Sequence, residues 1–379
     1  MNSKFYILRD VYLPGAAPIN RMLSFLRGFE ELGIDSEVVF FMPDKHGSKI
    51  DSSLYPHTTF TYLWGEGSSK NAYLKYIGGL INAINFRKKL NDGDAVLMLG
   101  NVFPDIICTK KRVRIFQEFT EHPDVVSNFT APFDSHHKRM HKYSRCASGT
   151  FVISTALKKY FIENGVEPEK VHIVNMTVDS TRFQGLTKSN NIEKYIAYCG
   201  TASNNKDGVD ELIKAFAIVH ESHPEYKLNI IGDAPSKEDE SGNARLVERL
   251  GLSNHVVFTG HVAPEMMPQI LKDAEILALD RPDSLQAQNG FPTKLGEYLL
   301  TENPVVVTKV GDIPLFLEDG KSALLAEERN PKDFASKINW AIEHSVEASE
   351  IGKCGAEVAM KSFNYHVESE KIVNIMKIK

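Results

Sequence analysis

The chain has 379 residues, of which 42% are hydrophobic and 25% charged, a composition typical of globular proteins and not of disordered or fibrous ones. Its length suits two domains. No apolar stretch approaches the roughly 20 residues that a membrane-spanning helix needs. Four scattered cysteines, Cys108, Cys146, Cys199 and Cys354, exclude a disulfide framework or a zinc site, so we expect a cytoplasmic protein.

Charge is unevenly distributed along the chain. Residues 1–190 hold 24 Lys and Arg against 19 Asp and Glu, a net +5, whereas the remainder holds 20 against 30, a net −10. The basic residues of the first half form clusters at Arg87–Lys89, Lys110–Arg114 and Lys138–Arg145. Such clusters are usually solvated faces, but they also fit contact with an anionic membrane surface or a phosphate-bearing acceptor. We expect no nucleic-acid partner.

Short apolar runs alternate with longer amphipathic stretches throughout the first half. Helices are predicted there at about 19–32, 71–90, 135–146 and 155–164. The predicted strands are Phe5–Leu8, Glu37–Phe41, Thr59–Leu63, Ala95–Leu99, Arg114–Phe119, Thr150–Ile153 and His172–Val174.

A second series follows the polar stretch Gly185–Glu193, which is typical of a linker. Helices are predicted near 208–222, 241–251, 264–273, 293–300 and 331–346. The predicted strands are Tyr195–Cys199, Lys227–Ile231, Val256–Thr259, Ile276–Leu279, Val305–Thr308 and Ala323–Ala326. The last segment, 365–379, has helical spacing and could cap either domain.

Strands that alternate with helices, without tight hairpin signals, require right-handed crossovers and a parallel sheet. We therefore predict an α/β protein with two Rossmann-like, doubly wound domains. The first would cover residues 1–185, with helix 365–379 able to join it, and the second residues 186–364. Their ligand is expected at the carboxyl ends of the strands, in the cleft between the domains.

The stretch from Asp280 to Glu297 leads from a strand through a polar loop into a helix. The start of that helix offers unpaired N–H groups and a positive dipole, which suit a phosphate. Lys294 lies in the first turn, where the dipole disfavours a cation, and so indicates a bound anion. Glu297 could accept hydrogen bonds from ribose hydroxyls. An ordinary helix start with surface charges is the alternative.

The segment Asn289–Val307, NGFPTKLGEYLLTENPVVV, resembles the donor-site signature of retaining glycosyltransferases of family 4. That resemblance implies the GT-B fold and two glutamates separated by seven residues. Glu297 matches the second glutamate, which in the family holds the nucleotide ribose. Asn289 replaces the first, which contacts donor-sugar hydroxyls, and keeps hydrogen bonding without charge. The resemblance also places in the donor site Gly290, Phe291, Pro292, Thr293 and Lys294.

Further matches run through the second half. The segment from Tyr195 to Ile213 resembles the family's first C-terminal strand and the loop after it, with Gly200 at the strand end. Lys206 matches a lysine that the family sets on the donor diphosphate, whereas Thr201 stands where an arginine is usual. Gly232 and Asp233 resemble a Gly-Asp-Gly turn of the same site. The similarity covers about residues 150–345 well and the first 150 only loosely.

In the first half, the loop containing Gly15 follows the first strand, and Arg21 lies in the next helix. The family places such a glycine loop against the donor phosphate, where Arg21 could reach an anion. His122 follows a strand end and resembles the histidine that the family aims at the reacting sugar. A plain strand–helix loop and an ordinary structural histidine are the alternatives.

The resemblance implies a retaining transfer of a hexose-type sugar from a UDP- or GDP-sugar to a glycan or lipid-linked acceptor, in bacterial surface polysaccharide or glycolipid synthesis. Cations and helix-terminal N–H groups can neutralise the departing diphosphate without a metal. The one Asp-x-Asp sequence, Asp92–Asp94, precedes a strand and is typical of a turn, so no metal and no cofactor are expected. The predicted catalytic residues are His122, Lys206, Asn289 and Glu297.

Two other functions stay open. A nucleotide-sugar epimerase uses the same fold but needs carboxylates around the sugar, which the neutral Asn289 does not supply. A catalytically weak sugar-nucleotide-binding protein would tolerate the substitutions at Thr201 and Asn289. A dinucleotide oxidoreductase is excluded, because no Gly-x-Gly-x-x-Gly follows the early strands.

The predicted helix 71–90 carries an apolar stripe next to the basic cluster Arg87–Lys89. Such a helix could bind the inner face of a membrane peripherally. We favour packing of the stripe on the sheet of its own domain. The residues of the stripe are Tyr73, Ile77, Leu80, Ile81 and Ile84.

Overall fold

The computed structural model describes residues 3–43, 47–64, 71–100, 102–110, 112–127, 143–190 and 193–378. The chain divides into two compact units, an N-terminal unit of residues 1–177 with 365–379 and a C-terminal unit of residues 178–364. Most of the predicted helix 135–146 lies outside the described residues, as do the cluster residues Lys111, Lys138, Arg139 and Lys142; residues 143–146 are helical.

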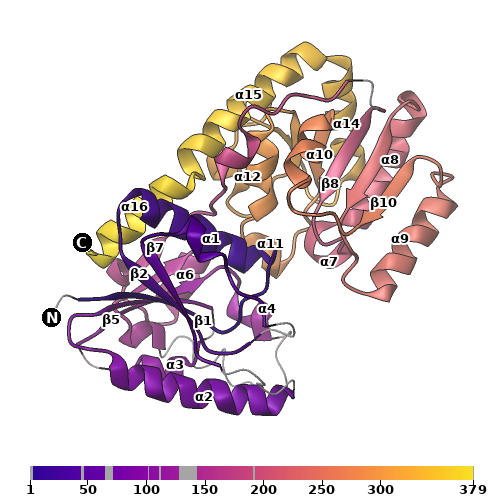
Figure 1. Cartoon of the computed structure of the whole chain (residues 1–379). Coiled ribbons are helices and arrows are strands. Elements are labelled where there is room, and N and C mark those ends of the chain that lie inside the picture. Colours follow the sequence, from indigo (N-terminus) through magenta and orange to yellow (C-terminus); the bar gives the residue numbers. More distant parts are fainter. Residues whose placement is uncertain are drawn as a thin grey trace. The chain divides into compact units, whose positions relative to one another are not determined.

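The N-terminal unit contains a seven-stranded, entirely parallel sheet in the order β3-β2-β1-β4-β5-β6-β7 (Figure 1). Every predicted strand of the first half is confirmed, with each end within one residue of its prediction. The strands are β1 (Phe5–Arg9), β2 (Ser36–Phe40), β3 (Thr58–Tyr62), β4 (Ala95–Leu99), β5 (Arg114–Phe119), β6 (Gly149–Val152) and β7 (Val171–Ile173).

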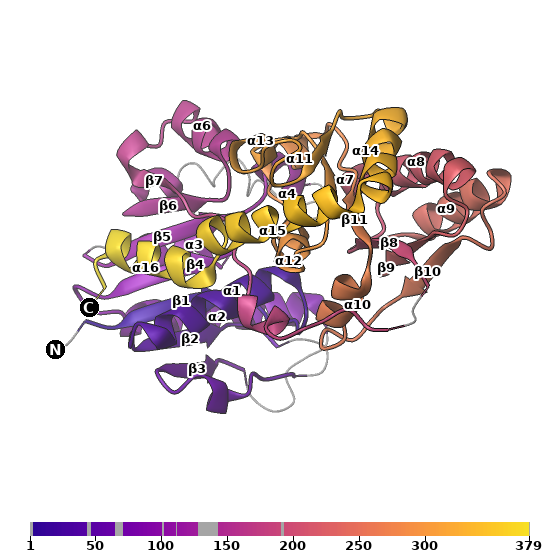
Figure 2. The same cartoon turned by 90° about the horizontal axis from the view of Figure 1, so that it is seen from above.

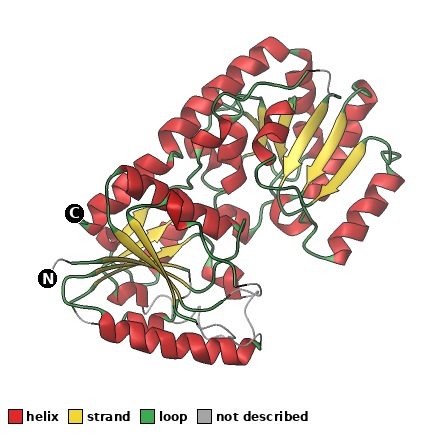
Figure 3. Cartoon of the chain, viewed as in Figure 1, coloured by secondary structure: helices red, strands yellow, loops and turns green. Residues whose placement is uncertain are grey.

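Helices cover both faces of this sheet (Figure 3). Alternate residues of β1 explain the two layers, because Phe5 and Ile7 point into one apolar core and Tyr6 and Leu8 into another. The first core is closed by α1 (Ala17–Glu31) and α16 (Tyr365–Met376), and the second by α2 (Ala72–Lys89) and α3 (Pro104–Ile107). The remaining helices of the unit are α4 (Pro123–Ser127) and α6 (Thr155–Glu163), with 3-10 turns η1 (Ser52–Leu54) and η2 (Pro168–Lys170).

The C-terminal helix α16 packs along α1, far from it in sequence (Figure 2). Tyr365 donates its hydroxyl hydrogen bond to Glu31 at 2.6 Å, and Glu368 accepts the N–H of Asn175 at 3.0 Å. Arg114 of β5 donates to the carbonyl of Met376 at 2.6 Å. These contacts fix the last segment of the chain to the N-terminal unit. Its helical spacing alone did not show which of the two domains it would join.

The C-terminal unit contains a six-stranded parallel sheet in the order β10-β9-β8-β11-β12-β13. Its predicted strands are likewise confirmed to within one residue. They are β8 (Tyr195–Cys199), β9 (Lys227–Ile231), β10 (Val256–Gly260), β11 (Ile276–Leu279), β12 (Val305–Thr308) and β13 (Leu324–Ala326). In both sheets the strand order reverses once, between β1 and β4 and between β8 and β11, which makes both units doubly wound.

The helices of this unit include one long element that the sequence did not predict, α15 (Ser345–Ser362). The predicted helix 331–346 ends earlier, at Glu343, because the chain turns at His344 and begins α15. The others are η3 (Ser180–Phe183), α7 (Asn204–Asp207), α8 (Val209–Ser222), α9 (Lys237–Arg249), α10 (Met267–Asp273), α11 (Leu285–Asn289), α12 (Thr293–Leu300), α13 (Ile313–Phe316) and α14 (Pro331–Glu343).

Helix α2 lies on its sheet by a different face from the one we favoured. Gly79 lies against Met42 and Phe103, and Ala83 and Phe86 are buried in the core. Within the predicted stripe only Leu80 packs there; the packing expectation is wrong for the other four, which are 42–68% exposed: Tyr73, Ile77, Ile81 and Ile84. The small residues let the helix approach the sheet closely, and the large apolar side chains of the stripe therefore lie on its outer face. Among the described residues, no helix combines the length and apolarity needed to cross a bilayer.

The contact between α1 and α16 yields a stability prediction. A Cβ added at Gly28 would lie 2.5 Å from Cβ of Ser369, so Gly28→Ala must push α16 away. We expect a loss of about 1–3 kcal/mol in the free energy of unfolding of the N-terminal unit.

Gly242→Ala is the matched control, because Gly242 lies within α9 with no other atom near its added Cβ. That change should be neutral or stabilise by about 0.5–1 kcal/mol. Thermal and urea unfolding of both variants give the comparison, and equal stability of the two would contradict the close packing of α1 on α16.

Candidate functional site

The best candidate for a ligand site in the C-terminal unit is the carboxyl edge of its sheet, where the strand order reverses between β8 and β11. Parallel strands bring their carboxyl ends to one edge, and a reversal in order leaves a gap there between the connecting loops. The loop after β8 carries Gly200 and Lys206, the loop after β9 carries Gly232 and Asp233, and α12 follows the loop after β11.

Two glycines let the loops after β8 and β9 approach closely. Gly200 has φ +144° and Gly232 φ +123°, backbone conformations that side chains disfavour. A Cβ at Gly232 would lie 3.0 Å from the carbonyl carbon of Gly200, and one at Gly200 would lie 2.7 Å from Cε of Lys294. The absence of a side chain at Gly200 therefore leaves room for the Lys294 side chain at the end of β8.

Lys294 reaches back from the first turn of α12 to a buried polar cluster. Its Nζ donates to Oδ2 of Asp207 at 2.6 Å and to the hydroxyl of Tyr198 at 2.9 Å. The Tyr198 hydroxyl also lies 2.8 Å from the same Asp207 oxygen, and the Lys294 amine stands over the Tyr198 ring. We call Lys294, Asp207 and Tyr198 the lysine cluster.

Burial and charge oppose each other within the lysine cluster. Burial alone would raise the pKa of Asp207, but Lys294, supported by Arg281 and Lys206, lowers it below its ordinary value. Burial lowers the pKa of Lys294, while Asp207 acts to raise it. Burial and the Asp207 charge raise the pKa of Tyr198 well above its ordinary value, so that this phenol stays neutral. The cluster is thus an ion pair beside a neutral hydroxyl.

Lys206 lies in α7, one residue before Asp207, the buried partner of Lys294. Its backbone N–H is capped by the Ser203 hydroxyl, and its half-exposed side chain forms no ion pair with any described residue. Thr201 is exposed beside Gly200, as is Asp233 after β9. Lys206 is therefore the cation of this edge that is most open to an anionic ligand.

The start of α12 leaves backbone donors without a side-chain cap. Pro292 is the N-cap residue and supplies no capping hydrogen bond to the N–H groups that follow it, from Thr293 on. Phe291 anchors the preceding loop by packing against Phe316 and Phe363. Gly290 is buried, and Asn289 donates its amide to the carbonyl of Leu285 at 2.9 Å, within its own short helix.

Glu297 is half-buried one turn further along α12. Its Oε1 accepts a hydrogen bond from Nη1 of Arg182 at 2.5 Å. The next residue, Tyr298, is fully buried and bridges to β8 by accepting the N–H of Cys199 at 2.5 Å and donating to its carbonyl at 3.2 Å. These contacts fix α12 against the end of β8.

Sequence reasoning did not find Arg182, Tyr198 or Asp207. Asp207 stands between Lys206 and Gly208, where the family pattern has lysine followed directly by glycine, and this insertion was the available signal. Gly208 has φ +58°, and Asp207 is buried facing Lys294. Local sequence does not reveal the contact of Tyr198 with Lys294 or that of Arg182 with Glu297, because the two pairs are separated by 96 and 115 residues.

In the N-terminal unit, Arg21 does not face a ligand, and the expectation that it reaches an anion is contradicted. Its side chain is 5% exposed and donates to Glu118 at 2.9 Å and to the carbonyls of Val174 and Asn175 at 3.0 and 2.7 Å. A buried guanidinium needs a carboxylate and further acceptors around it, and Glu118 and the two carbonyls supply them. Gly15 is exposed with φ +78° in the loop before α1.

His122 is buried immediately before α4. Its Nδ1 accepts the N–H of Asp124 at 3.2 Å, which places the ring proton on Nε2, and its ring packs against Tyr160 at 4.2 Å between centroids. Burial lowers the pKa of His122 in spite of the nearby Asp124, so the ring is neutral at pH 7. The histidine thus caps a helix, and it has one N–H left to donate.

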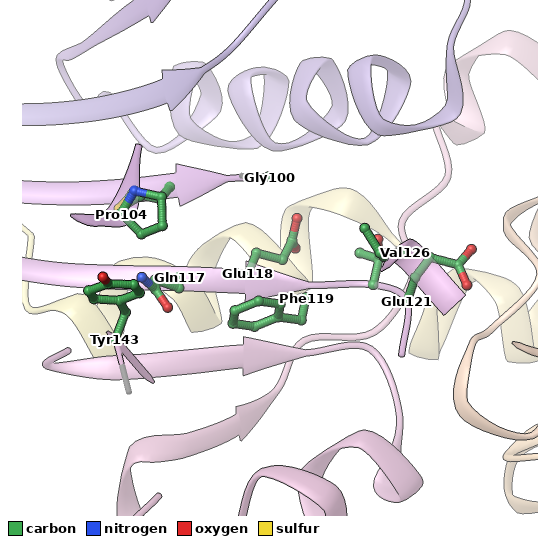
Figure 4. A pocket seen from close by; sticks show the side chains of 10 residues that line it. Gly100, Pro104, Gln117, Glu118, Phe119, Glu121, Val126 and Tyr143 are labelled. Atoms are coloured by element: carbon green, nitrogen blue, oxygen red, sulfur yellow. The ribbon is translucent and has the colours of Figure 1, made fainter. Parts of the chain in front are cut away.

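A pocket of about 130 Å³ opens at the carboxyl ends of β4 and β5 in the same unit (Figure 4). Phe119 and Val126 give it apolar walls, Glu121 brings a carboxylate, and Tyr143 lines the far end, whereas the Glu118 carboxylate points to the other side of β5 and pairs with Arg21. Such a lining accepts hydrogen bonds from hydroxyl groups and disfavours anions. Among the described residues, no group of three or more His, Cys, Asp or Glu is arranged to hold a metal ion.

Two parallel-sheet units with reversed strand order define an α/β protein of the GT-B class, and solved structures agree with this fold. Anabaena Alr3699/HepE, solved with UDP and glucose, matches with a TM-score of 0.77 over 99% of this chain and 100% of that one, at 17% identity. The lipopolysaccharide outer core galactosyltransferase WaaB matches with a TM-score of 0.68 over 99% of both chains, at 16% identity.

Residues 193–344, which lie in the C-terminal unit, match the family model of glycosyl transferases group 1. Mannosylfructose-phosphate synthase of Agrobacterium fabrum is 24% identical over 65% of this chain and 57% of its own length. D-inositol 3-phosphate glycosyltransferase of Corynebacterium jeikeium is 28% identical over 38% of this chain and 34% of its own. The matched part thus spans about half of these relatives or less.

The lysine cluster predicts a coupled effect on stability. Lys294→Met should destabilise the C-terminal unit by about 3 kcal/mol, because it removes the nearer of the two cations that face the buried Asp207 charge and leaves Arg281 at 3.9 Å. The double variant Lys294→Met/Asp207→Asn should lose clearly less than the sum of the two single changes. Lys188→Met is the control, since Lys188 pairs with Glu275 at the surface and should cost less than about 1 kcal/mol.

The lowered pKa of Asp207 decides how the stability of the C-terminal unit changes with pH. Its stabilisation is complete above the unfolded-state value of about 3.9 and disappears as the pH falls through the folded-state value. Urea unfolding of wild type, the two single variants, the double variant and the Lys188→Met control at neutral and acid pH measures both effects. Strictly additive losses would mean that Lys294 and Asp207 do not stabilise each other.

Proposed function

We propose that this protein is a retaining glycosyltransferase that moves a hexose-type sugar from a UDP- or GDP-sugar to a glycan or lipid-linked acceptor. The observation that carries the proposal is the carboxyl edge of the second sheet, where Lys206, Lys294 and the uncapped start of α12 gather around Gly200. This edge offers positive charge and backbone donors for a diphosphate, with Glu297 one turn away for a ribose. HepE, a structural neighbour, was solved with UDP and glucose.

The chemistry needs stabilisation of the leaving group more than a protein base. The acceptor hydroxyl oxygen bonds to the anomeric carbon from the face of the leaving group while the bond to the β-phosphate oxygen breaks. The hydroxyl proton passes to that phosphate oxygen. Lys206 takes the larger share of the phosphate charge, because Asp207 already neutralises Lys294. No metal is needed in this scheme, since Lys206 and the α12 N–H groups bear the charge.

The site also suggests which groups recognise the sugar and the acceptor. Asn289 is the proposed hydrogen-bond partner of the donor sugar in the C-terminal unit, and the Nε2–H of His122 is a proposed donor to a sugar hydroxyl in the N-terminal unit. Glu121 at the pocket of the N-terminal unit favours an uncharged, hydroxyl-bearing acceptor group over a phosphate. Surface polysaccharide or glycolipid assembly at the cytoplasmic face of a bacterial membrane would supply such acceptors.

Nucleotide binding tests the donor site. Wild-type protein should melt at a higher temperature with UDP or GDP, because a ligand of the folded state stabilises it. Lys206→Ala should abolish the shift from the diphosphate but leave the unliganded melting temperature unchanged. Glu297→Ala should weaken nucleosides as well as diphosphates. Lys188→Ala, at the opposite edge of the sheet, is the control and should behave as wild type.

An undiminished shift in Lys206→Ala would discard the phosphate assignment. Incubation of UDP- and GDP-sugars with and without acceptor, in the presence of EDTA, then separates the reactions. Transfer requires the acceptor and survives EDTA, whereas an epimerase changes the sugar without acceptor. Tight nucleotide binding with neither reaction would indicate the catalytically weak binding protein.

We propose further that the protein contacts an anionic membrane surface through α2. The exposed residues Tyr73, Leu74, Ile77, Ile81 and Ile84 lie along this helix, which borders the N-terminal unit in Figure 1 and ends in Arg87–Lys89. An apolar face that ends in three cations fits the interface of anionic lipids, to which each cation contributes about 1 kcal/mol.

Sedimentation with lipid vesicles tests this contact. Wild-type protein should bind vesicles that contain phosphatidylglycerol more strongly than pure phosphatidylcholine, and salt should weaken binding. Ile77→Glu/Ile81→Glu should reduce binding about tenfold or more, because two charges would enter the apolar interface. Val346→Glu, at an exposed apolar residue of α15, is the control. Unchanged binding of the double variant would rule out α2 as the contact.

A further inference from the structure

Arg182 joins three segments of the C-terminal unit at the carboxylate of Glu297. It comes from η3, and its Nη1 donates to Oε1 of Glu297 on α12 at 2.5 Å. Its Nη2 donates to the carbonyl of Pro264, in the loop between β10 and α10, at 2.8 Å. The two side chains are 32% and 26% exposed, so the pair lies at the surface of the site with its inner atoms covered. Arg182 is thus held in one orientation by an acceptor other than Glu297.

The surroundings of Glu297 disfavour a charge there. Burial raises the pKa of Glu297, Arg182 lowers it, and the nearby carboxylate of Asp179 raises it further. Cys199 and Tyr298, the other titratable groups that face it, have pKa values raised by burial, to about 12 for Cys199 and well above the ordinary value for Tyr298. Both are neutral near pH 7. Among the described residues, Arg182 is the one hydrogen-bond partner of the Glu297 side chain and its one paired cation.

The ionisation of Glu297 decides what it can bind. A ribose presents two neighbouring hydroxyl groups, each able to donate a hydrogen bond. An ionised carboxylate accepts at both oxygens and retains lone pairs on the oxygen that already binds Arg182. A protonated carboxyl loses part of that accepting capacity. A half-buried glutamate that binds a ribose therefore needs a cation beside it.

We propose that Arg182 is a positioning residue, which keeps the Glu297 carboxylate charged and oriented to accept the hydrogen bonds of the nucleotide ribose. The inference rests on the proposed function, which takes Glu297 as the ribose ligand. Arg182 does not touch the nucleotide itself; it acts through Glu297. The tie to Pro264 matters, because it stops the arginine from following a displaced carboxylate.

The test compares variants that separate charge from hydrogen bonding. Arg182→Gln keeps a donor but removes the charge, Arg182→Lys keeps the charge, and Glu297→Gln removes the carboxylate. Arg249→Gln, at an exposed residue in the last turn of α9, is the matched control. Affinity for UDP or GDP, whichever the wild type binds, is measured by calorimetry from about pH 5.5 to about pH 8.5, and inorganic pyrophosphate serves as a probe without ribose.

The expected result is a pH dependence that only one variant acquires. At each pH, Arg182→Lys and the control should bind the nucleotide as wild type does, because titration of the nucleotide's own terminal phosphate affects all the proteins alike. Arg182→Gln should bind about tenfold more weakly at the acid end, the loss of roughly one hydrogen bond to a charged group, and recover as rising pH ionises Glu297. Glu297→Gln should be weaker at every pH. Pyrophosphate affinity should be the same in all five proteins.

Two different failures can be told apart. If Glu297→Gln binds the nucleotide as wild type does, the ribose assignment within the proposed function is wrong, and the role of Arg182 falls with it. If Glu297→Gln is weak but Arg182→Gln shows a constant loss at all pH values, or none, Arg182 does not act through the charge of Glu297. Melting curves of all variants exclude misfolding, and Arg182→Lys still tests the charge if Arg182→Gln does not fold.

Discussion

The ion pair between Lys294 and Asp207 is the interaction on which the candidate site depends. It joins the first turn of α12 to α7, two segments that start from different strands, over a glycine that leaves room for the lysine chain. A buried pair of this kind returns little net stability, because each charge has lost its water. What it provides is geometry, since a buried charge must lie beside an opposite charge, and this requirement fixes the positions of both elements.

Other contacts extend the same principle across the C-terminal unit. Tyr298 bridges α12 to the backbone of β8 with two hydrogen bonds, and Arg182 holds the outer turn of α12 to the loop after β10. Helix α12 is thus fixed on both sides while its N-terminal N–H groups stay uncapped by side chains. Such preorganisation suits recognition of a charged ligand, because the donors need not rearrange when the ligand arrives.

The N-terminal unit uses its charges differently. Arg21 and Glu118 pair inside the unit and join α1 to the ends of β5 and β7, and His122 serves as a helix cap. Among the described residues of this unit, Glu121 lines the pocket and several apolar side chains lie exposed along α2. This half of the sequence carries a net positive charge, but Arg21 does not provide a phosphate site, because it is buried and paired with Glu118.

The sequence by itself determined the strands, because a buried parallel strand is a short apolar run and its ends show in the local pattern. It also predicted a donor segment from the order of Gly200, the start of α12 and Glu297. Only the tertiary structure decided which charges meet. Asp207 and Lys294 lie 87 residues apart, and Arg182 and Glu297 lie 115 apart, so no local pattern connects them. The outer face of α2 was predicted wrongly for a related reason. Large apolar side chains usually indicate the buried face of a helix, but in α2 the small residues Gly79 and Ala83 let the opposite face pack closely on the sheet.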